Sequence, residues 1–153
     1  MTVLEASIEI AAPPARVWEL LGTLDALERY DPGVTRSKIM STERTGIGAT
    51  RQCDLKPGGW FRERVTAWEP ERSLGFELFE CTLPVKRLQH NYVLTPIRGG
   101  TRVEQRMEYR LKFGPLGALM DAALVRRRWR AGIDSFMRGL KRLAEGGPDT
   151  VGS

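Results

Sequence analysis

Apolar and charged residues alternate without interruption from Arg102 to Phe113, and this is the clearest pattern in the chain. One set of alternate positions holds Val103, Gln105, Met107, Tyr109, Leu111 and Phe113, while every position of the other set is charged. Successive side chains of a strand point to opposite faces of its sheet. The pattern therefore predicts a strand with one face in solvent and the other face on a core or cavity.

The rest of the chain before this strand is read from similar alternation and from turn residues. Val3 to Ile10 predicts a first strand, Pro13-Pro14 opens a short helix that closes at Gly22, and Leu24 to Tyr30 predicts a second short helix. Turn signals then follow at the intervals of an antiparallel meander: Gly46-Ile47-Gly48, Pro57-Gly58-Gly59, Glu69 to Arg72, Pro84 and Arg98-Gly99-Gly100.

The last long segment, Pro115 to Glu145, has helix breakers on both sides and predicts one long helix. Its second half carries an apolar stripe at helical spacing: Trp129, Ile133, Phe136, Met137, Leu140 and Ala144. Its first half, Leu116 to Val125, is apolar on nearly all sides, so we expect more than one neighbour to cover it. A helix of this length spans roughly 45 Å, the width of a small domain.

These elements predict an α+β fold in which a curved seven-stranded antiparallel sheet grips the C-terminal helix, with two short helices after the first strand. A single helix cannot fill the inside of such a sheet, so an internal cavity of a few hundred Å³ is expected between them. Residues 1–146 are predicted to form one domain, and residues 147–153 a flexible tail.

Composition narrows the classes of partner. The 153 residues are 41% hydrophobic and 28% charged, no apolar run approaches a membrane span, and the start lacks a signal-peptide pattern, which favours a cytoplasmic protein. Cys53 and Cys81 lie far apart and form no metal-type spacing. The net charge of +5 raises the question of nucleic acid or anionic membrane. Because acidic and basic residues are interleaved on the strands, we expect no nucleic-acid partner.

Three stretches together resemble a known superfamily: IEIAAPPARVWELL, RERVTAWEPERSLGF and YVLTPIRGGTRVEQRMEYRLK. They are similar to the SRPBCC or START-like superfamily, in particular its polyketide cyclase/dehydrase-like branch, and they cover nearly the whole chain. The resemblance implies the helix-grip fold and a central cavity for lipids, polyketides or aromatic compounds. Some members are aromatase/cyclases and others are lipid or quinone carriers. The iron site of the Rieske-linked members is excluded, because the chain has one histidine.

Polar residues on the predicted inner face are the candidates for chemistry, because a buried polar group needs a partner or a ligand. The strand pattern turns Glu63, His90 and Tyr109 inward, and helical spacing places Arg126 near the centre of the apolar arc. These four form the candidate catalytic set. The predicted cavity lining comprises Phe61, Val65, Phe76, Leu78, Tyr92, Val103, Gln105, Met107, Met120, Trp129, Ile133 and Phe136.

Each candidate also has a purely structural interpretation. His90 is the only histidine, and a lone histidine on a strand is more often a satisfied core or rim residue than a catalytic one. Glu63 is predicted to pair with Arg126 and stay ionised; if Arg126 instead points to solvent, Glu63 becomes a desolvated acid of raised pKa. Trp129 is predicted to be buried against the sheet.

Three functions are compatible with these features. The favoured one is binding of a small hydrophobic or aromatic ligand, lipid-like or polyketide-like, in the cavity, without metal or cofactor. The first alternative is a polyketide aromatase/cyclase or dehydratase that uses acid–base residues of the same cavity. The second is a lipid or quinone carrier that docks on anionic membrane through Arg126, Arg127, Arg128 and Arg130. A monomer and a homodimer both remain open.

Overall fold

The computed structural model describes residues 1–147, and the proposed tail, apart from Gly147, lies outside the described residues. The elements in chain order are β1 (Thr2–Ile10), α1 (Pro14–Gly22), the 3₁₀ turn η1 (Leu27–Arg29), β2 (Val34–Ile39), β3 (Thr50–Leu55), β4 (Trp60–Glu69), β5 (Ser73–Cys81), β6 (Val85–Ile97), β7 (Gly100–Leu111), α2 (Gly114–Met120), the π-helical turn η2 (Asp121–Val125) and α3 (Arg126–Ala144).

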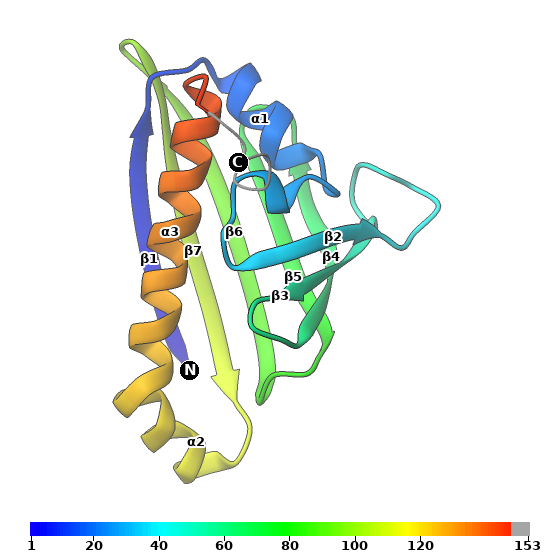
Figure 1. The fold of residues 1–153 in the computed structure, drawn as a ribbon, viewed down its shortest axis with the longest axis vertical. Coiled ribbons are helices and arrows are strands. Elements are labelled where there is room, and N and C mark those ends of the chain that lie inside the picture. Colours follow the sequence, from blue (N-terminus) through cyan, green and yellow to red (C-terminus); the bar gives the residue numbers. More distant parts are fainter. Residues whose placement is uncertain (148–153) are drawn as a thin grey trace.

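All seven strands form one antiparallel sheet in the order β1-β7-β6-β5-β4-β3-β2. Figure 1 shows the sheet curving so that α3 runs lengthwise beside β1 and β7 while β2 and β3 fold around the other side. The predicted helix-grip architecture is confirmed. A sheet with one apolar face buries that face by curling around a helix. Because of this curvature, β1 and β2 both lie near the helical layer although they are at opposite ends of the sheet order.

The core is most tightly packed around the second half of α3. Leu140 and Met137 are buried there, and so are Val65, Leu94 and Val103 on the concave side of the sheet. At Gly139 the backbone of α3 touches the chain after η1 so closely that an added Cβ would lie 1.7 Å from the carbonyl oxygen of Tyr30. Only glycine permits this approach. The predicted apolar stripe of this half-helix is thus the face that packs on the sheet.

Three details of the sequence prediction are wrong. The second short helix is only the 3₁₀ turn η1. The long helix is interrupted by η2, where the backbone widens to π geometry. The last strand ends at Leu111, because Phe113 adopts a left-handed backbone (φ 74°) as the residue before α2 and its side chain is exposed.

The first half of the helical run is also not covered as predicted. Gly117 and Asp121 are its only buried residues between Gly114 and Val125, while its apolar side chains face outward. The reason lies in the geometry of Figure 1, where α2 projects beyond the end of the sheet and has no second layer to pack on. Most of its large apolar side chains therefore remain at the surface, while Val125 packs on the core.

Candidate functional site

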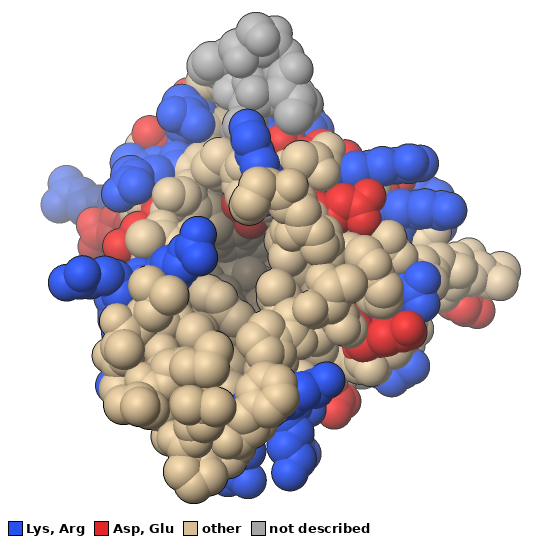
Figure 2. Space-filling view, turned by 60° about the horizontal axis from the view of Figure 1, so that its bottom comes forward, with Lys and Arg blue, Asp and Glu red and all other residues tan. Residues whose placement is uncertain are grey.

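The concave side of the sheet is packed at one end and open at the other. Inward-facing residues near the α2 end stay half-buried although they are apolar: Leu55, Phe61, Cys81, Leu83, Leu88 and Met107. Figure 2 shows a hollow at this end of the molecule, with mostly uncharged side chains around its rim. The helix therefore leaves part of the inner face accessible, as expected for a domain that holds a small molecule.

A buried polar cluster crosses the inner face on strands β3, β4 and β6. The Glu63 side chain is 1% exposed and accepts hydrogen bonds from Arg51, with Nε and Nη2 at 2.8 and 2.7 Å from Oε1. Its second oxygen, Oε2, lies 2.8 Å from Nε2 of His90. Arg51 also donates from Nη1 to the carbonyl oxygen of Leu24 at 3.1 Å. The register places Arg51 directly opposite Glu63, which is why the two side chains meet.

The charge state of this cluster follows from its neighbours. Burial alone raises the pKa of the Glu63 carboxyl, but the charge of Arg51 and the hydrogen bonds from Arg51 and His90 outweigh it and lower the pKa to about 2. Glu63 is therefore ionised near neutral pH. An ionised carboxylate only accepts hydrogen bonds, so Nε2 of His90 carries the hydrogen and donates it to Glu63. In the neutral ring Nδ1 is then left as an acceptor.

Two buried acceptors near this cluster lack a protein partner: Nδ1 of His90 and Oε1 of Gln105. They sit on neighbouring strands, β6 and β7, and Gln105 donates from Nε2 to the Tyr92 hydroxyl at 3.2 Å. Buried polar atoms in folded proteins are nearly always hydrogen-bonded. A pair of acceptors without donors on the inner face is therefore a feature that a ligand donor would complete.

Aromatic rings surround these acceptors and connect them to the helix. His90 stacks on Phe76 with ring centroids 5.1 Å apart and meets the edge of Tyr92 at 5.4 Å. Tyr92 contacts Phe136 of α3 at 5.4 Å, and the Arg51 guanidinium lies 4.4 Å above the Phe76 ring. The acceptors are thus embedded in flat apolar surfaces, an environment that suits an aromatic molecule.

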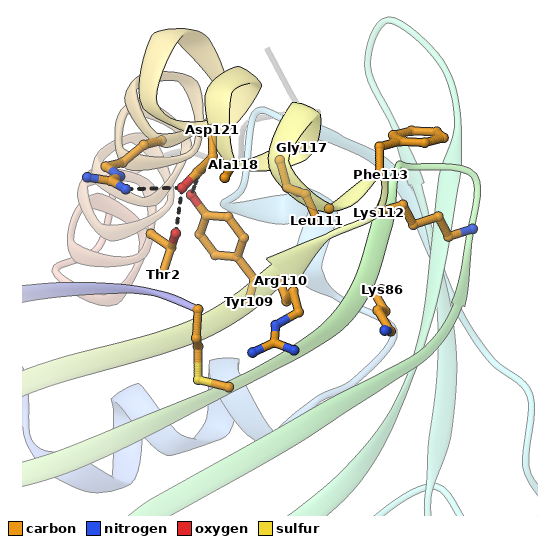
Figure 3. A pocket seen from close by; sticks show the side chains of 13 residues that line it. Thr2, Lys86, Tyr109, Arg110, Leu111, Lys112, Phe113, Gly117, Ala118 and Asp121 are labelled. Atoms are coloured by element: carbon orange, nitrogen blue, oxygen red, sulfur yellow. Dashed lines mark hydrogen bonds and ion pairs between the residues drawn. The ribbon is translucent and has the colours of Figure 1, made fainter.

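A second polar cluster lies at the α2 end, around Asp121 in the π turn (Figure 3). Asp121 accepts hydrogen bonds from the hydroxyls of Thr2, at 2.5 Å, and Tyr109, and pairs with Arg126 at 3.1 Å. Burial raises the pKa of Asp121, yet these three donors lower it overall; burial and Asp121 together raise the pKa of Tyr109 to about 12. The cluster fastens α2 and η2 to β1 and β7.

A pocket of about 490 Å³ lies beside this second cluster, between the end of β7 and the helical run. Apart from Tyr109, Asp121 and Arg126, its lining is formed by Met1, Thr2, Lys86, Arg110, Leu111, Lys112, Phe113, Gly114, Gly117 and Ala118. Its volume is in the range predicted from the sequence. Its lining includes only Tyr109 and Arg126 of the residues proposed for the site, because the pocket lies under α2 rather than under α3.

The four candidate catalytic residues fall into two separate places. Glu63 and His90 belong to the buried cluster, whereas Tyr109 and Arg126 belong to the Asp121 cluster. The predicted pair of Glu63 with Arg126 is wrong: Arg51 takes that place. Arg126 has a half-exposed side chain and contacts Asp121 instead. Both oxygens of Glu63 are occupied and its pKa is low, so its ionised carboxylate holds the side chains of Arg51 and His90 in place.

Arg51 and Asp121 were missed by the sequence prediction. Arg51 alternates with Cys53 on a short strand, so its inward direction was readable, but nothing identified the strand opposite it. Asp121 was marked by being the one acid within the apolar stretch from Leu116 to Val125.

The residues proposed to line the cavity differ in how deeply they are buried. Val65, Phe76, Tyr92, Val103, Gln105, Ile133 and Phe136 are buried; Phe61, Leu78, Met107 and Trp129 are half-buried; and Met120 is exposed. Met120 lies on the outside of α2, away from the core. Trp129, predicted to be buried, is half-buried and rests on Tyr109 with ring centroids 4.5 Å apart.

Among residues 1–147, no three His, Cys, Asp or Glu side chains gather in a way that could hold a metal ion. No helix within the same range is long and apolar enough to cross a membrane.

Solved structures share this fold over almost their entire length. A protein from Thermus thermophilus matches with a TM-score of 0.80 and 24% identity over 94% of this chain and 97% of its own. A START superfamily protein from Mycobacterium smegmatis gives a TM-score of 0.78 at 13% identity, covering 94% and 97%. The major latex-like protein of Panax ginseng gives 0.71 at 16%, covering 92% and 95%. At these identities the likeness establishes the fold alone.

Fold and hollow together define a helix-grip domain of the SRPBCC or START-like class. Residues 1–145 match the family described as polyketide cyclase/dehydrase and lipid transport, and the chain belongs to that family. An uncharacterized protein of Mycobacterium tuberculosis is 26% identical over 140 residues, which are 91% of this chain and 82% of that protein. The family and the fold indicate a domain that binds a hydrophobic ligand.

Proposed function

We propose that the hollow binds a small, mostly aromatic molecule that carries a hydroxyl group or another hydrogen-bond donor. The observation behind this proposal is the pair of buried acceptors without donors, Nδ1 of His90 and Oε1 of Gln105. A ligand hydroxyl would satisfy one of them, and the rings of Phe76, Tyr92 and Phe136 offer apolar contact. Polyketide-derived phenols and the head groups of quinols both have this chemistry.

The proposal is tested with two probes that differ by one hydroxyl, 1-naphthol and naphthalene, in a calorimetric titration. We expect 1-naphthol to bind about fivefold more tightly, the value of one hydrogen bond of about 1 kcal/mol. Gln105→Leu together with His90→Phe should abolish this preference. The matched control is Gln89→Leu, on the outward face of the same strand as His90, where the side chain is exposed and contacts Glu108. Equal affinity for both probes, or no binding of either, would refute the proposal.

A second candidate function, polyketide cyclisation, is favoured by the tautomer of His90. With Nε2–H held by Glu63, Nδ1 is free to take a proton, and the carboxylate stabilises the imidazolium that forms. In an aldol closure, Nδ1 would remove a proton from a methylene between two carbonyls. The carbanion then attacks a ketone carbon of the same chain, forming a C–C bond. The resulting alkoxide recovers the proton from His90, and loss of water completes the ring without any oxidant.

Turnover of a model poly-ketone by the wild type and by His90→Gln separates the two functions. General-base work by His90 predicts a loss of about 10²-fold or more in kcat. The control is Gln89→Leu, which changes an exposed side chain on the outward face of β6 and should leave kcat unchanged. Binding of 1-naphthol without turnover by the wild type would retain the binding function and reject the cyclase.

A further inference from the structure

The segment between the last strand and α3 presents an apolar surface that the ligand-binding hollow does not explain. We call it the apolar tip, defined as Phe113, Leu116, Leu119, Met120 and Leu124. Their side chains are 62%, 59%, 66%, 38% and 54% exposed. Residues 116, 119, 120 and 124 recur at the spacing of one helix face, so they form one patch rather than scattered residues. Monomeric soluble proteins seldom leave such a patch uncovered.

Basic side chains lie on both sides of the apolar tip in the sequence. They are Arg110, Lys112, Arg126, Arg127, Arg128 and Arg130, all exposed; we call them the basic collar. The only acid between Arg110 and Arg130 is Asp121, which is buried and paired with Arg126. Figure 2 shows a broad uncharged area beside the hollow, with lysine and arginine side chains at its edges.

From these two features we propose that the apolar tip inserts into the head-group region of an anionic lipid bilayer, with the basic collar on the lipid phosphates. An apolar helix face flanked by arginine and lysine is the arrangement by which interfacial helices bind such surfaces. A second copy of this chain fits less well, because a tip-to-tip contact brings two basic collars together without compensating acids.

The tip is also held in position before it meets a membrane. Asp121 ties η2 to Thr2 of β1 and to Tyr109 of β7, so the apolar side chains need not be ordered on binding. The pocket of about 490 Å³ lies between this tip and the sheet. A docked tip therefore places the open end of the hollow at the bilayer surface, where an apolar molecule can pass from lipid to protein without crossing water.

Co-sedimentation with lipid vesicles tests this surface without any cavity ligand, so its outcome is independent of the proposed function. The wild type should bind vesicles of phosphatidylcholine mixed with phosphatidylglycerol. Its affinity for vesicles of pure phosphatidylcholine should be more than about tenfold lower, because each cation of the basic collar contributes about fivefold to the affinity for an anionic surface. Leu116→Glu combined with Leu119→Glu should lower binding about tenfold or more, since the glutamates cannot enter the apolar layer. Arg127→Glu with Arg128→Glu should lower it by more than about tenfold.

Matched controls lie at other exposed positions of the molecule. Ile47→Glu changes an apolar side chain that is 69% exposed in the loop before β3, and Arg72→Glu with Arg98→Glu reverses two charges at turns on the other end of the strands. Both should keep full vesicle binding. The proposal is overturned if the tip variants bind like the wild type, or if the controls lose binding equally. It is also overturned if the protein ignores vesicles and instead forms a dimer that Leu119→Glu dissociates.

Discussion

Two stretches of the same helical run, residues 113–124 and residues 133–144, are both rich in large apolar side chains but bury them differently. In α3, Ile133, Phe136 and Leu140 pack on the concave sheet and are at most 6% exposed. In α2 and η2 the apolar side chains point outward because no layer lies over them. Apolar composition therefore identifies a surface that avoids water, and only the presence of an opposing layer decides whether that surface becomes core or a docking site.

The two ends of the molecule also treat their buried carboxylates differently. Glu63 is held by Arg51, which is itself only 4% exposed, whereas Asp121 pairs with Arg126, whose side chain is half-exposed. Removing one member of a buried ion pair leaves the other charge buried and unpaired, which lowers the free energy of unfolding strongly. Removing the partner of a charge that reaches water lowers it much less. We therefore expect mutation of Glu63 at the packed end to lower stability strongly, and mutation of Asp121 at the α2 end to lower it weakly, although both carboxylates are buried and paired.

The largest difference is expected between the two carboxylates. Glu63→Gln removes the only carboxylate that Arg51 contacts in the described chain and should lower the free energy of unfolding by about 3–5 kcal/mol. Asp121→Asn keeps one acceptor oxygen, for Thr2 or for Tyr109, and the Arg126 side chain that it releases already reaches water, so the change should cost only about 1–2 kcal/mol. Urea unfolding at neutral pH measures both. Equal losses in the two variants would contradict the contrast between the ends.

The contribution of Glu63 to stability should also depend on pH. The pKa of Glu63 is lowered from 4.5 to about 2 in the folded protein, so the unfolded chain binds its proton first as pH falls. The stability that Glu63 contributes is complete above about pH 4.5 and is lost between there and about pH 2. Urea midpoints measured across this window should fall more steeply for the wild type than for Glu63→Gln. Parallel pH profiles would show that Glu63 is not ionised in the fold.

A leucine taken from each end gives the next contrast. Leu140→Ala leaves a cavity under α3 at a position that is fully buried and should cost about 2–5 kcal/mol. Leu119→Ala shortens a side chain of the apolar tip that already faces solvent, and should change stability by less than about 0.5 kcal/mol. Thermal unfolding of the pair checks this. A large loss for Leu119→Ala would mean that another element covers the tip.

Two glycines of α3 should differ in the sign of their effect. Gly139→Ala places a Cβ against the carbonyl oxygen of Tyr30 and should destabilise the protein by about 1–3 kcal/mol. At Gly132 an added Cβ meets nothing within 4 Å, so Gly132→Ala should raise stability by up to about 1 kcal/mol through helix propensity. Urea midpoints that shift in opposite directions confirm the close contact at Gly139; a shift in the same direction would place α3 farther from η1.

The fold could be predicted from patterns among residues that are close together in the sequence. Alternation between Arg102 and Lys112 identified the inward residues of β7, and turn residues marked the strand boundaries, because both signals depend on neighbours in the sequence. The partner of Glu63 could not be found in this way. Arg51 faces Glu63 only through the register of β3 against β4, which connects distant parts of the chain.

The direction of Arg126 was mispredicted for a different reason. Its place in the apolar arc assumed a regular advance of about 100° per residue. The π turn Asp121–Val125 advances by less per residue and shifts the phase of the helix that follows. The exposure of the apolar tip could not be predicted either, because the sequence shows which residues are apolar but not where the sheet that would cover them ends.

The most direct test of the central claim, that the inner face holds a hydroxyl-bearing aromatic ligand, is NMR observation of the His90 ring. It is the only histidine in the chain, so its ring resonances are assigned without ambiguity. Titration with 1-naphthol should shift the Nδ1 and Cε1 signals of His90 and saturate at the dissociation constant measured by calorimetry, while naphthalene causes a much smaller Nδ1 shift. An unchanged His90 spectrum at concentrations where 1-naphthol is bound would place the ligand elsewhere and contradict the account.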